Sequence, residues 1–397
     1  MMNDMAGEAP GGGSIKPSLA GPPTAAAVDA AIRPILAVFI VWHPNSASGE
    51  QLAVMAFKEL CADPDLPSVR GLGIPVRFRT AVGASEVPAP VPFGGAVHTA
   101  VFVLADDALV ASALWRTYLE GLVESRRPSD VIIPVALTDV RNLPAGLRSL
   151  QAIRLDRPAA DIRAVFLRDG IHDVCRVLDP NAAQVRVFLS HAKQDGLELT
   201  TVIRRYLNEE ARLDEFFDAA DIPDGARFAE FVTTAAGSQH ALLAVQTDSY
   251  ASREWCRLEV LEAKRQQVPI VVLAAFDRGE PRSFPYIGNV PVVRWHGNES
   301  LPLVVAALLR EVLRARYFPR RVEAICRLHG LQPARQVFAY PPELLTALIF
   351  RRQAPTTGAT RDQLVYPDPP LGTKELELLR LFDPDLEPVT PTMLRAS

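Results

Sequence analysis

The sequence predicts two consecutive α/β domains, each built on a five-stranded parallel sheet with helices on both faces, followed by a short C-terminal extension. Three observations lead to this fold class. Apolar runs of about five to seven residues alternate with helical patterns, the order of these elements occurs twice, and the pattern changes after residue 318. Short continuous apolar runs are typical of parallel strands, because helices cover both faces of such a sheet.

The first domain is expected at residues 31–180. It opens on the apolar run "PILAVFIVWH" and continues as apolar runs that alternate with helical patterns. The expected strands are residues 34–43, 74–80, 98–106, 129–137 and 150–155, and the expected helices are residues 49–60, 113–125 and 161–178.

The second domain is expected at residues 181–318 and has the same order of elements. Its first strand, "VRVFLS", is followed by the polar turn "HAKQDG" and then by a helix with apolar residues at helical spacing. The expected strands are residues 185–190, 215–219, 240–246, 268–276 and 290–295, and the expected helices are residues 197–207, 227–236, the second half of 247–264, and 301–318.

Equivalent features of the two domains lie at a nearly constant spacing. His98 and His240 each open a third strand and are 142 residues apart, and Trp115 and Trp255 on the following helices are 140 residues apart. We interpret this spacing as a tandem duplication of one α/β domain. The alternative is that two unrelated domains of this fold class share the same order of elements. Both histidines are expected to be structural.

The two ends of the chain differ from the domains. Residues 1–30 are rich in Gly, Pro and Ala and have no basic segment followed by an apolar core, so we expect a disordered tail rather than a signal peptide. Residues 319–397 are expected to form a helical and Pro-rich extension, with short helices within 338–353 and 373–382. This extension is short for a core of its own and is expected to dock on the second domain or on a partner.

Composition and charge exclude several classes of protein. The net charge is −4, with acidic and basic residues interspersed, which argues against a nucleic-acid partner. No apolar run reaches the ~18 residues that a membrane helix needs, and the four cysteines lie far apart. Such cysteines favour neither a disulfide framework nor a zinc site, and we expect a soluble, cytoplasmic protein that does not bind a membrane.

Common catalytic signatures are missing from the sequence. It contains no GxxxxGK[ST] phosphate loop, no GxSxG nucleophile motif, no dinucleotide-binding glycine pattern and no histidines at metal-ligand spacing. Cys256 has no evident histidine partner and is expected in the core rather than as a nucleophile. We therefore expect neither a metal nor a resident cofactor.

Polar residues gather after the first three strands of the second domain. The carboxyl ends of parallel strands meet at one edge of the sheet, and ligands of open α/β domains bind at this edge. The residues expected there are Ser190, His191, Asp195 and Gly196 after the first strand, Asp218 and Gly225 after the second, and Ser252, Trp255 and Glu259 after the third.

Glu259 has two readings when it is taken alone: a catalytic carboxylate or a solvated charge on a helix. Ser252 is a plausible N-cap for its helix, and the positive end of the helix dipole is expected to help keep Glu259 ionised. Trp255 lies four residues earlier and shares a helix face with Glu259, so it either walls a pocket or enters the core. The neighbouring Glu254 and Glu262 are expected to be solvated.

Three ordered segments carry a resemblance to a known family. "VFLSHAKQD", "FFDAADIPDG" and "SYASREWCRLE" resemble the first, second and third sequence boxes of the Toll/interleukin-1 receptor (TIR) domain family. The resemblance covers about residues 185–318, and the WCxxE element within the third box is its most diagnostic part. It implies a flavodoxin-like, three-layer domain with a five-stranded parallel sheet, which agrees with the order of elements.

The resemblance also implies an activity. Enzymatic members of the family cleave NAD and release nicotinamide, giving ADP-ribose or a cyclised product, and the glutamate of WCxxE, here Glu259, is their catalytic residue. Ser190, His191, Asp218, Gly225, Ser252 and Trp255 are then expected to bind the substrate NAD. In the family, the loop at 221–227 gates the site and mediates self-association. The implied biological role is that of a bacterial immune effector against phage.

The first domain is expected to lack this activity. Alignment of Trp115 with Trp255 places Leu119 opposite Glu259, and alignment of His98 with His240 places Thr117 there. We interpret the first domain as a degenerate TIR-like unit that serves sensing, docking or assembly, with an activating partner bound by it or by the extension. Two other functions stay open for the whole chain: a non-enzymatic scaffold that signals by self-association, and a site for nucleic acid or another nucleotide, although the acidic balance argues against nucleic acid.

Overall fold

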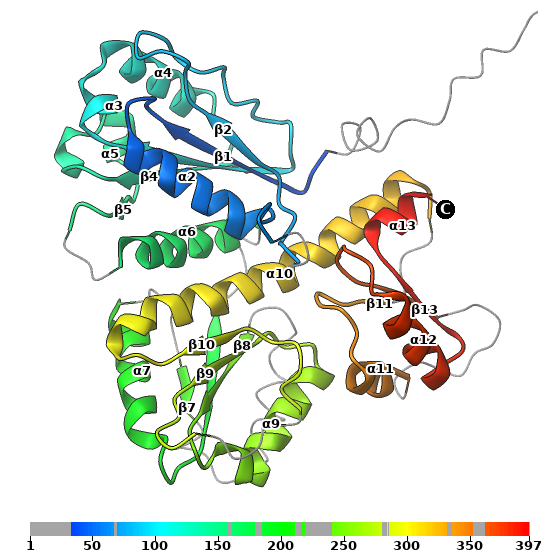
Figure 1. Cartoon of the computed structure of the whole chain (residues 1–397). Helices are drawn as coiled ribbons and strands as arrows, with labels where there is room; N and C mark the ends of the chain where they lie inside the picture. Colours follow the sequence, from blue (N-terminus) through cyan, green and yellow to red (C-terminus); the bar gives the residue numbers. More distant parts are fainter. Residues whose placement is uncertain are drawn as a thin grey trace, which may run out of the picture. The chain divides into compact units, whose positions relative to one another are not determined.

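The computed structural model describes residues 33–66, 70–157, 161–178, 185–210, 216–218, 240–279, 284, 286–331, 336–351 and 362–396. The expected tail at 1–30, the expected helix at 227–236 and the loop at 221–227 lie outside these residues. No helix in the described ranges combines the length and the apolar character that a crossing of the bilayer requires. The described chain contains three parallel sheets (Figure 1).

The first sheet has the strand order β2-β1-β3-β4-β5, and all of its neighbouring strands are parallel. Alternate residues of β1 face two hydrophobic clusters, one with α2 and α6 and the other with α3, α4 and α5, which gives three layers. The strands are β1 (Leu36–Trp42), β2 (Val76–Arg79), β3 (His98–Ala105), β4 (Val131–Ala136) and β5 (Ile153–Arg154). The helices are α2 (Ala47–Leu60), α3 (Asp107–Ala111), α4 (Ala113–Glu124), α5 (Ala145–Arg148) and α6 (Ile162–Leu178), with a 3₁₀ turn at Val140–Asn142.

The second sheet repeats this topology with the order β7-β6-β8-β9-β10, again with parallel neighbours. In both sheets the first strand lies between the second and the third, which is the flavodoxin-like order. The predicted fold class is therefore confirmed. The strands are β6 (Arg186–His191), β7 (Phe216–Asp218), β8 (His240–Gln246), β9 (Ile270–Ala274) and β10 (Val292–Arg294), and the helices are α7 (Leu197–Glu210), α9 (Glu254–Arg265) and α10 (Leu301–Leu328), with 3₁₀ turns η4 (Tyr250–Ser252) and η5 (Asn298–Ser300).

The two faces of the second sheet are covered by different helices. Val187 and Leu189 of β6 belong to the cluster that includes α7 and α10, whereas Phe188 packs with Cys256 and Val260 of α9. This alternation follows from the two-residue period of a strand. It places α9, the helix that carries Glu259, on the face opposite α7 and α10.

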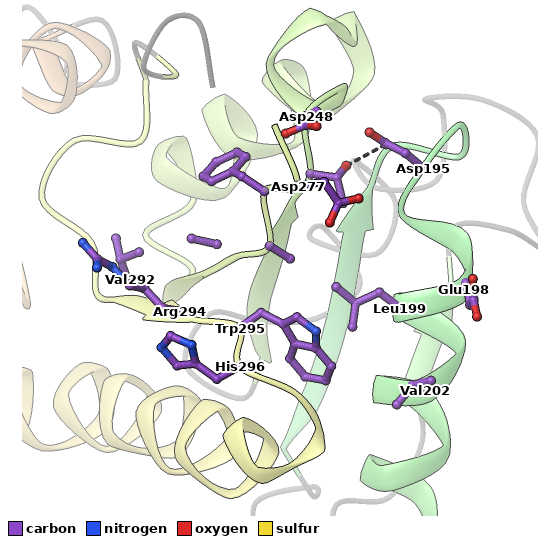
Figure 2. A pocket seen from close by; sticks show the side chains of 14 residues that line it. Asp195, Glu198, Leu199, Val202, Asp248, Asp277, Val292, Arg294, Trp295 and His296 are labelled. Atoms are coloured by element: carbon purple, nitrogen blue, oxygen red, sulfur yellow. Dashed lines mark hydrogen bonds between the residues drawn. The ribbon is translucent and has the colours of Figure 1, made fainter. Parts of the chain in front are cut away.

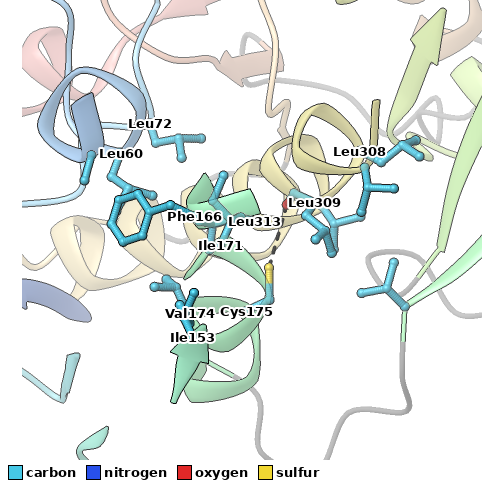
Figure 3. Packing of buried hydrophobic residues seen from close by; sticks show 14 of the residues in the cluster. Leu60, Leu72, Ile153, Phe166, Ile171, Val174, Cys175, Leu308, Leu309 and Leu313 are labelled. Carbon is cyan, nitrogen blue, oxygen red and sulfur yellow. Dashed lines mark hydrogen bonds between the residues drawn. The ribbon is translucent and has the colours of Figure 1, made fainter. Parts of the chain in front are cut away.

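Helices α6 and α10 pack against each other and join the cores of the two domains. One continuous hydrophobic cluster includes Phe166 and Cys175 of α6 together with Leu309 and Leu313 of α10 (Figure 3). The Cys175 thiol donates to the Leu309 carbonyl over 3.7 Å. Burial raises the pKa of Cys175 to about 12, so this cysteine is a core residue in its protonated form.

The C-terminal extension differs from its prediction in two respects. Helix α10 continues to Leu328, ten residues beyond its expected end, with Pro319 inside the helix. The extension also contains a three-stranded parallel sheet that the sequence analysis did not predict, and it buries a small cluster of its own around Tyr366 and Leu379. Its elements are β11 (Gln336–Val337), α11 (Leu344–Arg351), β12 (Asp362–Val365), α12 (Thr373–Phe382), β13 (Leu386–Val389) and α13 (Pro391–Ala396).

Candidate active site

Two segments of the second domain meet at the carboxyl-terminal edge of its sheet. The first is the end of β6, Ser190 and His191, with the turn that leads into α7. The second follows β8 and contains η4 and the start of α9. Strands β6 and β8 are neighbours, with Ser190 opposite Ala244, so the residues that follow them are brought together by the parallel register.

The turn after β6 is fixed to the segment after β8 through Asp195. Its carboxylate accepts hydrogen bonds from the Thr247 hydroxyl at 2.7 Å and from the Ser249 backbone amide at 2.9 Å. Burial opposes ionisation of Asp195, but these hydrogen bonds hold its pKa below the ordinary value. The next residue, Gly196, lies close to the Ala192 backbone: a Cβ at this position would be 2.9 Å from the Ala192 carbonyl oxygen, so the turn favours glycine here.

Glu259 is bound to the end of β6 by a short hydrogen bond. The hydroxyl of the fully buried Ser190 donates to Glu259 Oε2 over 2.5 Å, and the same hydroxyl oxygen lies 2.7 Å from the phenol oxygen of Tyr250. Tyr250 was not singled out by the sequence analysis, although it lies within the third sequence box. The three side chains therefore form a chain of hydrogen bonds from η4 through β6 to α9.

Burial raises the pKa of Glu259 to about 7, while the hydrogen bond from Ser190 acts in the opposite direction. Desolvation is therefore the larger effect on this carboxylate, and Glu259 lies beyond the first turn of α9, where the helix dipole acts most strongly. No basic side chain forms an ion pair with Glu259 within the described part of the chain. Near neutral pH the site therefore contains both the neutral and the ionised form.

Trp255 and Cys256, which are adjacent on α9, have opposite environments. Trp255 is 49% exposed, so it is not a core residue, and it shares a helix face with Glu259 one turn away. Cys256 is buried, and burial followed by the nearby Glu259 raises its pKa to about 12. A thiol with this pKa is not a nucleophile at neutral pH.

The other predicted residues are placed as follows. His191 is buried, and its Nε2 atom has no hydrogen-bond partner among the described residues. Ser252 is exposed and donates to the Ser249 carbonyl, and Arg253 rather than Ser252 occupies the N-cap position of α9, so the predicted cap is wrong. Asp218 ends β7, the strand beside β6, and nothing is described of its side chain. Gly225 lies outside the described residues.

A pocket of about 830 Å³ lies beside this site on the α7 side of the sheet (Figure 2). Leu199 of α7 and Trp295 after β10 line it, and Asp195 with Thr247 lies at its border with the Glu259 site. Glu259 itself is not among the lining residues, since α9 covers the other face of the sheet. The pocket and the Glu259 carboxylate therefore lie on opposite faces of the sheet, and both adjoin the segments that contain Asp195 and Thr247.

The equivalent helix of the first domain carries no carboxylate at this place. Trp115 of α4 is fully buried and packs against His43 with ring centroids 5.3 Å apart. Leu119, one turn later, is also fully buried, and Thr117 is exposed and donates to its own helix. Both alignments of the two helices thus place a residue without acid–base chemistry opposite Glu259.

These observations define an open α/β domain whose sheet carries, at its carboxyl edge, a half-buried carboxylate that no basic side chain of the described residues pairs with. Residues 187–301 match the family model of the TIR domain, and this part of the chain is a TIR domain. The match begins in β6 and ends at the first residue of α10, so it contains all of the residues of the site described above.

Comparisons over the whole chain add little. No curated protein matches it. Among solved structures, tagatose-6-phosphate ketose/aldose isomerase from Escherichia coli is 10% identical with a TM-score of 0.22, over 71% of this chain and 82% of that one. The C-terminal domain of glucosamine-fructose-6-phosphate aminotransferase from Francisella tularensis is 10% identical with a TM-score of 0.20, over 76% and 86%. These scores carry no argument about fold or function.

Proposed function

We propose that the second domain cleaves NAD at the bond between nicotinamide and ribose, with Glu259 as its catalytic residue. The observation that carries the proposal is the position of the Glu259 carboxylate, oriented by Ser190 over 2.5 Å at the edge of the sheet in a TIR domain. As in the enzymatic members of the family, NAD is a substrate here and no resident cofactor takes part.

The chemistry requires only one carboxylate. Glycosidases generally use two, because the leaving oxygen must be protonated. In NAD the leaving group is a pyridinium nitrogen, so the electron pair of the broken bond neutralises it, and nicotinamide departs without a proton. Positive charge then develops on the ribose, and an ionised Glu259 stabilises that charge. Water addition completes hydrolysis to ADP-ribose and releases one proton, whereas attack by an adenine nitrogen gives a cyclic product.

The surroundings of Glu259 fit this role. The half-exposed Trp255 offers an aromatic face one helical turn from the carboxylate, suited to the flat nicotinamide ring. His191 and Ser252 lie on the two segments that flank the site. Asp218 and Gly225 are further proposed contacts of the substrate. The pocket on the α7 side is less suitable for the pyrophosphate, because its four carboxylates outnumber its basic side chains, Arg294 and His296. The carboxylates are Asp195, Glu198, Asp248 and Asp277.

The test is chromatography of NAD after incubation with the wild type, Glu259→Gln and Glu254→Gln, at several protein concentrations. Glu254 is an exposed carboxylate on the same helix and serves as the matched control. We expect Glu259→Gln to lose about 100- to 1,000-fold of the rate, with Glu254→Gln close to the wild type. Nicotinamide release that is equal in Glu259→Gln and the wild type contradicts the assignment.

A role in bacterial defence against phage follows from this activity, because NAD depletion or an NAD-derived signal stops an infected cell. We place the protein in the cytoplasm, where NAD is available. Self-association of TIR domains and an activating partner bound by the first domain or the extension are the proposed means of control.

The second candidate function is a non-enzymatic scaffold. Two consecutive domains with one topology, of which the first lacks the carboxylate, favour it. Sedimentation combined with the NAD assay distinguishes the two functions: a scaffold assembles and leaves NAD intact, whereas the enzyme releases nicotinamide when it is assembled.

A further inference from the structure

We propose that Tyr250 is a positioning residue for Glu259: its buried phenol donates to Ser190 Oγ and thereby directs the single hydroxyl proton of Ser190 onto the Glu259 carboxylate. The consequence for catalysis rests on the proposed function. The hydrogen-bonded arrangement itself does not depend on that function.

The geometry leaves little freedom to the three groups. Tyr250 is 1% exposed, Ser190 is fully buried, and the Tyr250 ring packs edge-on against Phe284 with ring centroids 5.8 Å apart. The oxygen of Ser190 lies 2.7 Å from the Tyr250 phenol and 2.5 Å from Glu259 Oε2. Both distances are within hydrogen-bonding range, so the Ser190 oxygen connects the other two groups.

The direction of the hydrogen bonds follows from counting protons. An ionised carboxylate only accepts, and a serine hydroxyl has one proton to donate. When Glu259 is ionised, Ser190 gives its proton to Glu259, and the hydrogen bond between Ser190 and Tyr250 must use the phenol proton. Burial raises the pKa of Tyr250 well above its ordinary value, so this phenol keeps its proton and remains a donor.

Protonation of Glu259 permits the reverse direction. The neutral carboxyl group then donates to the Ser190 oxygen, and Ser190 can donate to the phenol oxygen. Glu259 gains one proton from outside the three groups, and Ser190 and Tyr250 each keep their own. The arrangement therefore serves both forms of Glu259, and the phenol proton is required only for the ionised form.

Other titratable and charged groups around the three residues do not replace this function. The Cys256 thiol of α9 lies within hydrogen-bonding reach of Ser190, and it is protonated because burial and Glu259 raise its pKa to about 12; a thiol is a weaker donor than a phenol. Arg253 precedes α9 and binds the side chain of Gln194. The imidazole Nδ1 of His191 in β6 lies 3.4 Å from the Leu189 carbonyl oxygen. Among the described residues, Ser190 is therefore the side chain that donates a hydrogen bond to ionised Glu259.

Removal of the phenol oxygen has a defined consequence. Ser190 in Tyr250→Phe loses the phenol as a donor to its oxygen and keeps only the Cys256 thiol, a weak donor within hydrogen-bonding reach. The Ser190 hydroxyl is then less polarised and less firmly directed at Glu259. Ionised Glu259 is then less stabilised, and its titration midpoint moves upward. One hydrogen bond accounts for a shift of about half a pH unit to one unit. Ser190→Ala removes the direct bond, so it shifts the midpoint in the same direction and further.

The test uses ¹³C NMR of the full chain labelled at the glutamate carboxyl carbons. The signal of Glu259 is identified by its loss in Glu259→Gln, and its titration is compared between the wild type, Tyr250→Phe and Tyr286→Phe. Tyr286 is the matched control, because its ring contacts the same Phe284 and its side chain is 37% exposed. We expect the upward shift in Tyr250→Phe alone; a midpoint equal to that of the wild type overturns the proposal.

Kinetics give a second readout. Below the wild-type midpoint, Tyr250→Phe is expected to lower kcat for nicotinamide release by about 3- to 10-fold, with near-normal kcat at pH 8.5 and an unchanged KM. A decrease of kcat that is equal at all pH values indicates a merely structural role and also overturns the proposal. The NMR titration needs no turnover, so a protein that leaves NAD intact but shows the shift refutes the proposed function and retains this inference.

Discussion

Lys264 of α9 forms a 2.7 Å ion pair with Glu343, the residue that precedes α11 in the C-terminal extension. Lys264 is only 8% exposed, and the second oxygen of Glu343 accepts a 2.5 Å hydrogen bond from the Asn289 amide. Gly288 has a left-handed φ of 59°, and a Cβ there would collide with the Glu343 carboxylate. The extension is thus fixed to the helix that carries Glu259.

The first prediction concerns this contact. Glu343→Ala leaves the Lys264 ammonium buried without its partner. We therefore expect the free energy of unfolding to fall by about 1–3 kcal/mol. This is less than for a fully buried pair, because Glu343 is partly exposed. Hydrogen exchange of the α9 and α11 amides is expected to become faster, and exchange in the first sheet to stay the same.

Glu323→Ala is the control for this change. Its ion pair with Arg327 on α10 is exposed on both sides, at 64% and 71% of the side chains, and is expected to contribute less than about 1 kcal/mol. Equal effects of the two substitutions on unfolding would show that the Lys264–Glu343 pair does not fasten the extension.

The second prediction uses the two equivalent tryptophans. Trp115→Ala removes a fully buried ring from the first domain and is expected to cost about 3–5 kcal/mol of the free energy of unfolding. Trp255→Ala removes a ring that is 49% exposed, so we expect at most about 1 kcal/mol, together with a several-fold increase of KM for NAD. Urea unfolding and initial rates measure both. A large loss of stability in Trp255→Ala is the result that assigns Trp255 to the core.

The third prediction follows from the raised pKa of Glu259. The ordinary value of 4.5 applies to the unfolded chain and about 7 to the folded one. Between these pH values the folded state holds a proton that the unfolded state has lost, so this group makes stability fall as the pH rises, with no further change above about pH 8. Glu259→Gln removes this dependence.

The difference in the free energy of unfolding between Glu259→Gln and the wild type, measured in urea, is therefore expected to depend on pH. The stability gained by the substitution should be larger at pH 8 than at pH 5, by about 2 kcal/mol. Glu254→Gln, at an exposed position of the same helix, should give no such difference. A gain in Glu259→Gln that is the same at both pH values shows that Glu259 has an ordinary pKa.

Much of the fold could be predicted from local patterns. The first strand of the second domain was expected at 185–190 and is found at Arg186–His191, because a central parallel strand must be apolar on both faces. The sheet of the extension escaped prediction because β11 has only two residues, Gln336–Val337. Its pairing of Gln336 with Leu364 is a long-range contact that leaves no periodic signal.

Only part of the site could be predicted, because its long-range contacts and its burial also leave no local signal in the sequence. The resemblance to the TIR family indicated Glu259, and the parallel register places Ser190 beside it. Sequence spacing could not give the degree of burial, which decides the pKa of Glu259 and separates the exposed Trp255 from the buried Trp115. Tyr250 was missed because its partner, Ser190, lies 60 residues earlier in the chain.

The most direct test of the central claim is ¹H NMR of NAD incubated at pH 8 with concentrated wild-type protein and, separately, with Glu259→Gln. The nicotinamide ring protons distinguish bound from released nicotinamide in one spectrum. We predict release by the wild type and by Glu254→Gln, and a loss of release in Glu259→Gln. Release at the wild-type rate by Glu259→Gln, or intact NAD after incubation with the assembled wild type, contradicts the assignment of Glu259 as the catalytic residue of an NAD-cleaving TIR domain.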